Sequence, residues 1–270
     1  MSTKLTRYFT GILVLVLLAG SLISGCDGPE VKQRYEPTWE SLKQHQVPDW
    51  FDDAKFGIFI HWGVYSVPAY ESEWYPRHMY REGSDIFQYH VENYGHPSEF
   101  GYKDFIPEFT AENWDPEEWA DVFHQAGARY VVPTAEHHDG FAMWDSDLTE
   151  WDAMDKGPHR DIIGELEQAV RDRGMKYAPS YHRAHNWYYY TCADNYDTCD
   201  PQFSGLYSTP HPDQEHPAEE WLRDWKARWE EIRDRYRPDF LWFDFGWGET
   251  AFHPYAKQII ADYYNLAREW

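Results

Sequence analysis

Two adjacent histidines and an aspartate follow an apolar run in the stretch TAEHHDGFAMWDS, residues 134–146. His137, His138 and Asp139 stand where a strand would end. Side chains of these types can hold a metal ion, act as a catalytic base, or bind the hydroxyl groups of a sugar. The two histidines alone do not discriminate among these three chemistries.

A carboxylate in the stretch LWFDFGWGE, residues 241–249, is the second candidate for chemistry. Asp244 lies in an apolar segment and is flanked by Trp242 and Phe245. Because a carboxylate is costly to bury there, it needs a role. One such role is the nucleophile of a retaining glycosidase. The alternative is a structural aspartate that is hydrogen-bonded to backbone.

The elements that must position these residues alternate between strands and helices. Short apolar runs predict buried strands at 55–62, 129–135, 176–182 and 239–245. Helical spacing of apolar residues predicts helices at 116–126, 160–173, 217–236 and 255–270, the first capped by Asp115. Strand and helix in alternation indicate parallel strands joined by right-handed crossovers.

The polar residues stand at the carboxyl ends of the predicted strands, which favours a (β/α)₈ barrel. They are His61, His137, His138, Tyr181, His182 and Asp244. A doubly wound sheet would place them similarly, but no glycine-rich phosphate loop follows any strand. Only four strands are present by residue 245, so we expect the barrel to be incomplete in this chain. A complete, smaller α/β domain is the alternative.

The N-terminus is typical of a secreted bacterial lipoprotein. Residues 1–26 contain a basic start, an apolar run and the ending Ile23-Ser24-Gly25-Cys26, so we expect lipidation of Cys26. A plain cleaved signal or an uncleaved anchor is the alternative. We expect 27–47 to be a tether, 48–270 to form the partial barrel domain, and the protein to be anchored in the bacterial cell envelope, facing the periplasm or the cell surface.

Composition limits the partners. The net charge of −23 becomes −25 when residues 1–25, with Lys4 and Arg7, are removed. Such an acidic chain should not bind nucleic acid, and it should meet a membrane only through its lipid anchor. Aromatic residues make up 19% of the chain, and the 15 Trp residues suit a carbohydrate site as well as a core. Cys192 and Cys199 favour a local disulfide over a metal site.

Four long motifs, in this order, resemble the α-L-fucosidases of glycoside hydrolase family 29. They are AKFGIFIHWGVYSVPAYESEWY (54–75), WDPEEWADVFHQAGARYVVPTAEHHDGFAMWDS (114–146), GPHRDIIGEL (157–166) and PDFLWFDF (238–245). The resemblance runs from about residue 48 to 270. It implies a (β/α)₈-like catalytic domain that cleaves terminal α-L-fucose from glycoconjugates with retention and without a cofactor.

Carried over by motif, the resemblance assigns Asp244 as the nucleophile. It assigns His61, Glu73, Trp74, His137 and His138, and less directly Tyr181 and Trp242, to the fucose pocket. Three features depart from the family. SYHRAHNW replaces a Tyr-Tyr-Ser type of strand ending, Phe245 stands where a Gly is usual, and the family's acid/base lies tens of residues beyond the nucleophile, past Trp270.

Two other classes of function remain open at this level. The chain could be a carbohydrate-binding surface lipoprotein that lacks catalysis. It could also be a metal-dependent hydrolase that uses His61, His137, His138 and His182, with His185 nearby. Linkage preference and oligomeric state are not encoded in any motif that we recognise.

Overall fold

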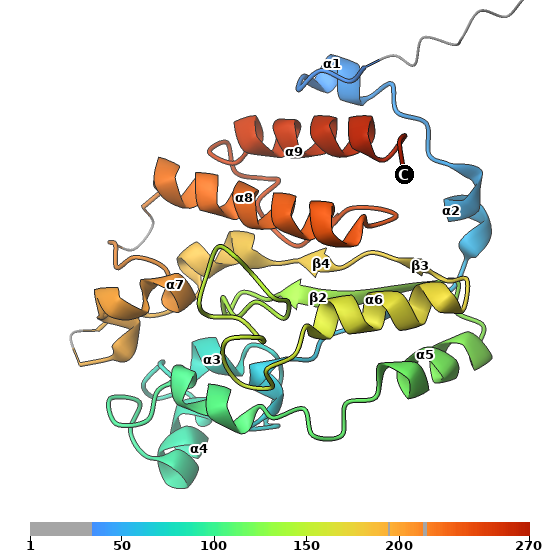
Figure 1. Cartoon of the computed structure of the whole chain (residues 1–270). Helices are drawn as coiled ribbons and strands as arrows, with labels where there is room; N and C mark the ends of the chain where they lie inside the picture. Colours follow the sequence, from blue (N-terminus) through green and yellow to red (C-terminus); the bar gives the residue numbers. More distant parts are fainter. Residues whose placement is uncertain (1–33, 194, 213–214) are drawn as a thin grey trace, which may run out of the picture. The chain divides into compact units, whose positions relative to one another are not determined.

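The computed structural model describes residues 34–193, 195–212 and 215–270 (Figure 1). The chain divides into two units, Met1–Arg34 and Tyr35–Trp270. The predicted signal segment and Cys26 therefore lie outside the described residues. No helix in the described part of the chain combines the length and apolarity that a membrane span requires.

The second unit contains nine α-helices and five strands among its described residues. The helices are α1 (Trp39–Leu42), α2 (Asp49–Ala54), α3 (Tyr75–His78), α4 (Asp85–Tyr94), α5 (Pro116–Gln125), α6 (Ile162–Asp172), α7 (Ser204–Tyr207), α8 (Glu219–Tyr236) and α9 (His253–Leu266). The strands are β1 (Gly57–Ile60), β2 (Tyr130–Glu136), β3 (Lys176–Tyr177), β4 (Ser180–Tyr181) and β5 (Trp242–Phe243).

All strand pairs in the described sheet are parallel, and the strands follow one another across the sheet in chain order, with β3 and β4 both beside β2. The order is β1-β2-β4-β5, and β3 pairs with β2. The helices follow the same order, since α5 contacts α6, α6 contacts α8, and α8 contacts α9 (Figure 1). A doubly wound sheet would reverse its strand order part-way. This singly wound order is that of a barrel, as the sequence predicted.

Two predicted strands are shorter or interrupted in the structure. The run 176–182 is split into β3 and β4 because Pro179 has no N–H to donate. The ladder continues through the gap, where the Ala178 N–H donates to the Val131 carbonyl at 3.1 Å. The run 239–245 keeps strand geometry only in β5, although the Asp244 N–H still reaches the Tyr181 carbonyl at 3.3 Å.

N-terminal caps explain where the barrel helices begin; the sequence predicted the cap at Asp115 but not the one at Asp161. The Asp115 carboxylate accepts the Glu118 N–H at 2.9 Å at the start of α5, and Asp161 accepts the Gly164 N–H at 2.8 Å at the start of α6. The apolar side of α6, with Ile163 and Leu166, is buried in the core. This helix, which contacts β2 and β3, therefore covers the outer side of those strands with its apolar stripe.

Strand alternation gives the sheet two different faces. Trp62 points outward and packs on Trp114 and Trp119, with ring centroids 5.0 and 5.3 Å apart. On the other face, Phe59 contacts His61 at 5.1 Å and Trp242 at 5.0 Å. Phe59, His61 and Trp242 thus share the face that is the inside of a barrel.

The prediction of a tether over 27–47 is wrong for its last part. Tyr35 and Leu42 are buried with Ala261 of α9, and the Tyr35 N–H donates to Asn265 Oδ1 at 2.8 Å. The His45 ring stacks on Tyr264 with centroids 3.8 Å apart. Proline and charged residues suggested a tether, but the aromatic and apolar side chains between them bind to α9.

Cys192 and Cys199 form a disulfide in the loop after the segment Arg183–Tyr188. The pairing closes a short loop in which Thr198 Oγ1 also donates to the Thr191 carbonyl at 2.8 Å. The bridge therefore anchors a loop that lies close in sequence to the carboxyl end of β4.

Replacing both cysteines, Cys192→Ser with Cys199→Ser, should lower the free energy of unfolding by about 2–3 kcal/mol, because a loop of this length is constrained in the unfolded chain. Urea unfolding without reductant would measure the loss. Reductant should lower the stability of the native protein and leave the double variant unchanged. Two free thiols in the native protein, unfolded without reductant, would contradict the bridge.

Candidate active site

Four histidines and an aspartate meet at the carboxyl ends of the strands. His61 follows β1, His137 and His138 follow β2, His182 follows β4, and Asp244 follows β5. Ring centroids of His61, His137 and His182 lie 5.1–5.4 Å apart in all three pairs. The residues that the sequence placed at strand ends therefore form one cluster, except for Tyr181.

His137 and His138 both reach the cluster because β2 ends before them. The register of β2 against β4 shifts between Thr134 and Glu136, and the chain turns after Glu136. The two imidazole centroids are 4.3 Å apart. On a regular strand these side chains would point to opposite faces. The bulge and the turn therefore bring together two residues that strand geometry would separate.

Asp244 is the carboxylate of the cluster. Its Oδ2 lies 3.8 Å from His138 Nε2 and 3.6 Å from His182 Nδ1. The side chain is 43% exposed, so an incoming molecule can reach it. Burial raises the pKa of Asp244, His61 opposes that shift, and the Glu73 carboxylate adds to it. Glu73 therefore lies close enough to interact with Asp244 electrostatically, as expected of a residue at the same pocket.

The imidazoles of the cluster are neutral near pH 7. Burial lowers the pKa of His138 to about 3 and that of His182 to about 2. Burial and the neighbouring rings also hold the pKa of His137 well below its usual range, and burial lowers the pKa of His61. A neutral imidazole offers one N–H donor and one acceptor. That combination suits sugar hydroxyl groups, which both donate and accept.

Two aromatic side chains stand beside the cluster. The Trp74 ring lies 5.3 Å from His138 and 5.6 Å from His185, between centroids. Phe245 stacks on His185 at 4.7 Å and contacts His138 at 5.1 Å. These rings provide apolar surface on which the apolar face of a sugar can lie. Trp242, 44% exposed, instead packs on Phe59 along the inner sheet face.

Phe245 has an unusual backbone at the position where the family pattern suggested glycine. Its φ is +65°, in the left-handed region that a bulky residue rarely adopts, and Gly246 follows at +86°. The strained turn points the Phe245 ring toward His185 and leaves it 49% exposed. The sequence marked this residue as a departure but did not predict that it would contact the histidines.

Tyr181 does not line the pocket, so that prediction is wrong. Its side chain is fully buried, and its hydroxyl donates to the Trp225 carbonyl of α8 at 2.9 Å. Its ring packs against Phe243 and Trp229. Because residues alternate along the strand, Tyr181 points toward α8 while His182 points to the pocket. The end of β4 therefore places His182, and not Tyr181, at the pocket.

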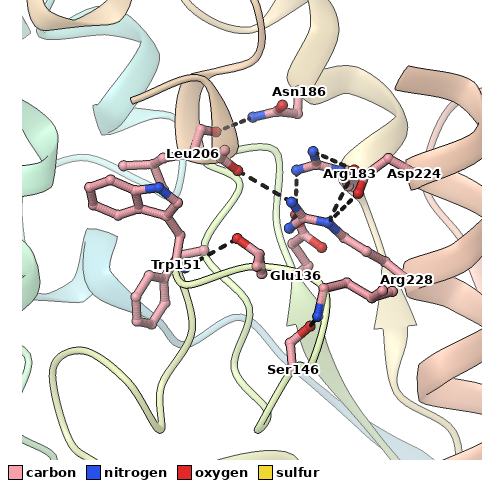
Figure 2. A network of polar contacts seen from close by, with 12 residues as sticks. Glu136, Ser146, Trp151, Arg183, Asn186, Leu206, Asp224 and Arg228 are labelled. Atoms are coloured by element: carbon pink, nitrogen blue, oxygen red, sulfur yellow. Dashed lines mark hydrogen bonds and ion pairs between the residues drawn. The ribbon is translucent and has the colours of Figure 1, made fainter. Parts of the chain in front are cut away.

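A buried ion network joins Glu136, Arg183, Asp224 and Arg228 (Figure 2). Arg183 Nη1 contacts Glu136 Oε1 at 2.7 Å, and Arg183 Nη2 contacts Asp224 Oδ2 of α8 at 2.9 Å. Arg228 adds contacts to Glu136 at 3.2 Å and Asp224 at 3.1 Å. Glu136 precedes His137, and Arg183 follows His182. The network therefore fixes the backbone of two strand ends, a role that the sequence analysis missed although both residues adjoin predicted site histidines.

Glu249, the next carboxylate along the chain after Asp244, is not part of the histidine cluster. Its Oε2 accepts the Tyr188 hydroxyl at 2.8 Å, and it lines a cavity of 640 Å³ with Arg77, Arg81 and His185. His185 also contacts His138, so this cavity adjoins the histidine cluster. A larger cavity of 880 Å³ lies at the other end of the strands, where Trp50, Phe240 and Arg171 line it, and it shares no residue with the cluster.

Comparison with known proteins identifies the family. A model described as alpha-L-fucosidase matches residues 23–269. The chain belongs to the α-L-fucosidase family. Tissue alpha-L-fucosidase of Rattus norvegicus is 40% identical over 259 residues, which cover 94% of this chain and 51% of that protein. The human tissue enzyme is 46% identical over 179 residues, 66% of this chain and 37% of that protein.

Solved fucosidase structures agree with the fold. The crystal structure of Thermotoga maritima alpha-fucosidase in complex with fucose superposes with a TM-score of 0.73 at 38% identity, over 87% of this chain and 55% of that one. A complex of the same protein with a mechanism-based inhibitor gives a TM-score of 0.74 at 40% identity. The predicted (β/α)₈ class and the predicted family are therefore confirmed. The chain spans about half the length of these relatives.

Arg183→Met should lower the free energy of unfolding by about 3–5 kcal/mol, because it leaves the buried Glu136 carboxylate short of a partner. Adding Glu136→Gln should restore part of the loss, because the uncompensated charge is then gone. Urea unfolding of both singles and the double variant would measure the coupling. Arg173→Met, at a surface ion pair with Glu117 and Asp121, is the matched control and should cost less. Strictly additive losses would contradict the network.

Proposed function

We propose that this chain forms the nucleophile-bearing part of a retaining exo-α-L-fucosidase that releases terminal α-L-fucose from glycoconjugates. The observation that supports this most is the reachable Asp244 carboxylate set among neutral histidines at the carboxyl ends of parallel strands. Family membership adds the sugar and the stereochemistry, since a fucosidase relative of similar fold is described in complex with fucose. Asp244 then attacks the anomeric carbon to form a fucosyl-enzyme, which water releases.

The surrounding residues would hold the sugar. His61, His137 and His138 offer donors and acceptors to fucose hydroxyls, and Trp74 offers its ring face. Glu73 stands close enough to raise the pKa of Asp244, and we assign it to sugar binding. His182, which lies 3.6 Å from Asp244, joins this set in place of Tyr181. His137, His138 and His182 are buried, so their hydrogen bonds to a sugar would be poorly screened by water.

The acid/base carboxylate belongs, in this proposal, to the part of the relatives' length that this chain does not span. A retaining enzyme needs a second carboxyl group about 5–5.5 Å from the nucleophile. Glu249 is near in sequence but is bonded to Tyr188. Without an acid/base, a substrate with a poor leaving group should react about 10²–10⁴-fold more slowly.

The test uses an aryl α-L-fucoside with a very good leaving group, with and without azide. Such a leaving group needs no acid, and azide replaces the water that a base would activate. The native 270-residue chain should release a burst of aryl alcohol and then turn over in an azide-dependent manner. Asp244→Asn should lower the rate of the burst and the rate of azide-dependent turnover by at least about 10³-fold, because the nucleophilic carboxylate is gone. Glu112→Gln, at an exposed loop, is the control and should behave as native.

Two outcomes would count against this assignment. A burst that persists in Asp244→Asn would show that another group is the nucleophile. Fucose binding by the native chain, measured by calorimetry, without any burst or azide-dependent turnover would favour the non-catalytic sugar-binding alternative.

The proposal includes a lipid anchor at Cys26 in the bacterial cell envelope, supported by the N-terminal sequence alone. Expressed in a bacterium, the native chain should sediment with membranes and partition into detergent. Cys26→Ser should move it to the soluble fraction, because no diacyl group can be attached. The Cys192→Ser, Cys199→Ser double variant is the matched control and should stay with the membrane. An unchanged distribution of Cys26→Ser would show that membrane attachment does not depend on a lipid at this residue, as expected of an uncleaved anchor.

A further inference from the structure

The carboxylate of Asp244 is approached by two imidazole nitrogens rather than one. His138 Nε2 and His182 Nδ1 both face Asp244 Oδ2, at 3.8 and 3.6 Å. All three donor atoms lie within 4.8 Å of one another. Three ligand atoms of these types, from three different strand ends, converge on one point.

The far nitrogen of each imidazole is already anchored. His138 Nδ1 is hydrogen-bonded to the His182 carbonyl at 2.6 Å, and His182 Nε2 to Ser180 Oγ at 2.9 Å. Metal-binding histidines characteristically hold their second nitrogen in this way, which fixes the ring and the tautomer. The inner nitrogens are thereby left to bind something in the pocket.

His182 Nδ1 is the atom that most requires a ligand. The side chain is about 1% exposed, and Nδ1 has no hydrogen-bond partner within the part of the chain that the structure describes. His137 Nδ1, in the neighbouring ring, is likewise buried without a partner among those residues. Buried polar atoms without partners are rare, so each calls for an explanation.

We propose that His138, His182 and Asp244 bind a borderline divalent cation of the Zn²⁺ class in the sugar-free protein. Two imidazoles and one carboxylate are a donor set that zinc accepts, with an open fourth position. Calcium and magnesium prefer all-oxygen sites, so the nitrogen donors disfavour them. Tetrahedral bonds of about 2.0–2.1 Å place donors about 3.3–3.4 Å apart. The two distances from the imidazole nitrogens to Asp244 Oδ2, 3.8 and 3.6 Å, therefore need to close by only a few tenths of an ångström, and the two nitrogens lie within 4.8 Å of one another.

The proposed cation site overlaps the proposed sugar pocket, but one of its ligands lies outside the family pattern. His182 is supplied by SYHRAHNW, the segment in which the chain departs from the family pattern. The cation would occupy Asp244, so it should compete with fucose; only this competition rests on the proposed function. Zinc would then inhibit the enzyme reversibly, and it takes no part in the chemical step.

The test titrates the metal-free native chain with Co²⁺, which reports tetrahedral coordination by visible absorption, and with Zn²⁺ by calorimetry. We expect one ion per chain and displacement of Co²⁺ by Zn²⁺. His138→Asn and His182→Gln keep the anchored nitrogen and remove the inner one. Asp244→Asn removes the carboxylate at an exposed side chain, where the fold should be unaffected. Each variant should weaken binding more than about tenfold.

His124→Asn is the control, because His124 is exposed on α5, away from the cluster. It should bind Co²⁺ as the native chain does. No stoichiometric binding by the native chain, or equal affinity in all three site variants, would overturn the proposal. Added L-fucose should weaken Zn²⁺ binding. If Zn²⁺ binds at this site and L-fucose does not displace it, the metal site stands and the sugar assignment fails.

Discussion

The ion pair between Glu136 and Arg183 connects the strand ends on which the site depends. Glu136 is fully buried at the end of β2, and Arg183 begins the segment after β4. Asp224 and Arg228 extend the pair to α8, so sheet and helix layers are joined by charges in a low-dielectric interior (Figure 2). Such a network stabilises one arrangement sharply, because any displacement leaves a charge unpaired. The network therefore also fixes the positions of the adjacent residues His137 and His182.

The cluster combines a reactive carboxylate with an environment that carries little positive charge. Burial keeps the imidazoles neutral, so they stabilise Asp244 through oriented dipoles rather than through ion pairs. A neutral, hydroxyl-rich sugar suits such a site. The same lack of charge makes the imidazole nitrogens available as ligands, since a neutral imidazole is the form that binds metal. The proposed sugar binding and the proposed cation binding therefore follow from one property of the pocket, and they would exclude one another at Asp244.

The inner face of the sheet leaves large hydrophobic side chains partly exposed. Phe59 and Trp242 are 37% and 44% exposed, whereas a closed barrel fills its interior with side chains. The outer face, in contrast, is covered by α6, which contacts β2 and β3, and by side chains of α5 and α8, since Trp119 packs on Trp62 and Trp225 on Tyr181. The site lies at the boundary, because His137, His138 and His182 are buried while His61 and Asp244 remain reachable.

The sequence by itself determined the strand regions, their parallel order, the helices α5, α6, α8 and α9, and which strand ends carry chemistry, because those features depend on local apolar periodicity, caps and proline. The helices α1–α4 and α7 were not predicted from it. His61, His137, His138 and Asp244 could be predicted for that reason. The tertiary structure decided where side chains point. The bulge in β2 brought His137 and His138 together, the orientation of β4 buried Tyr181 and selected His182, and α9 held residues 35–47. Each of these depends on contacts between segments distant in sequence, so no local pattern could reveal them.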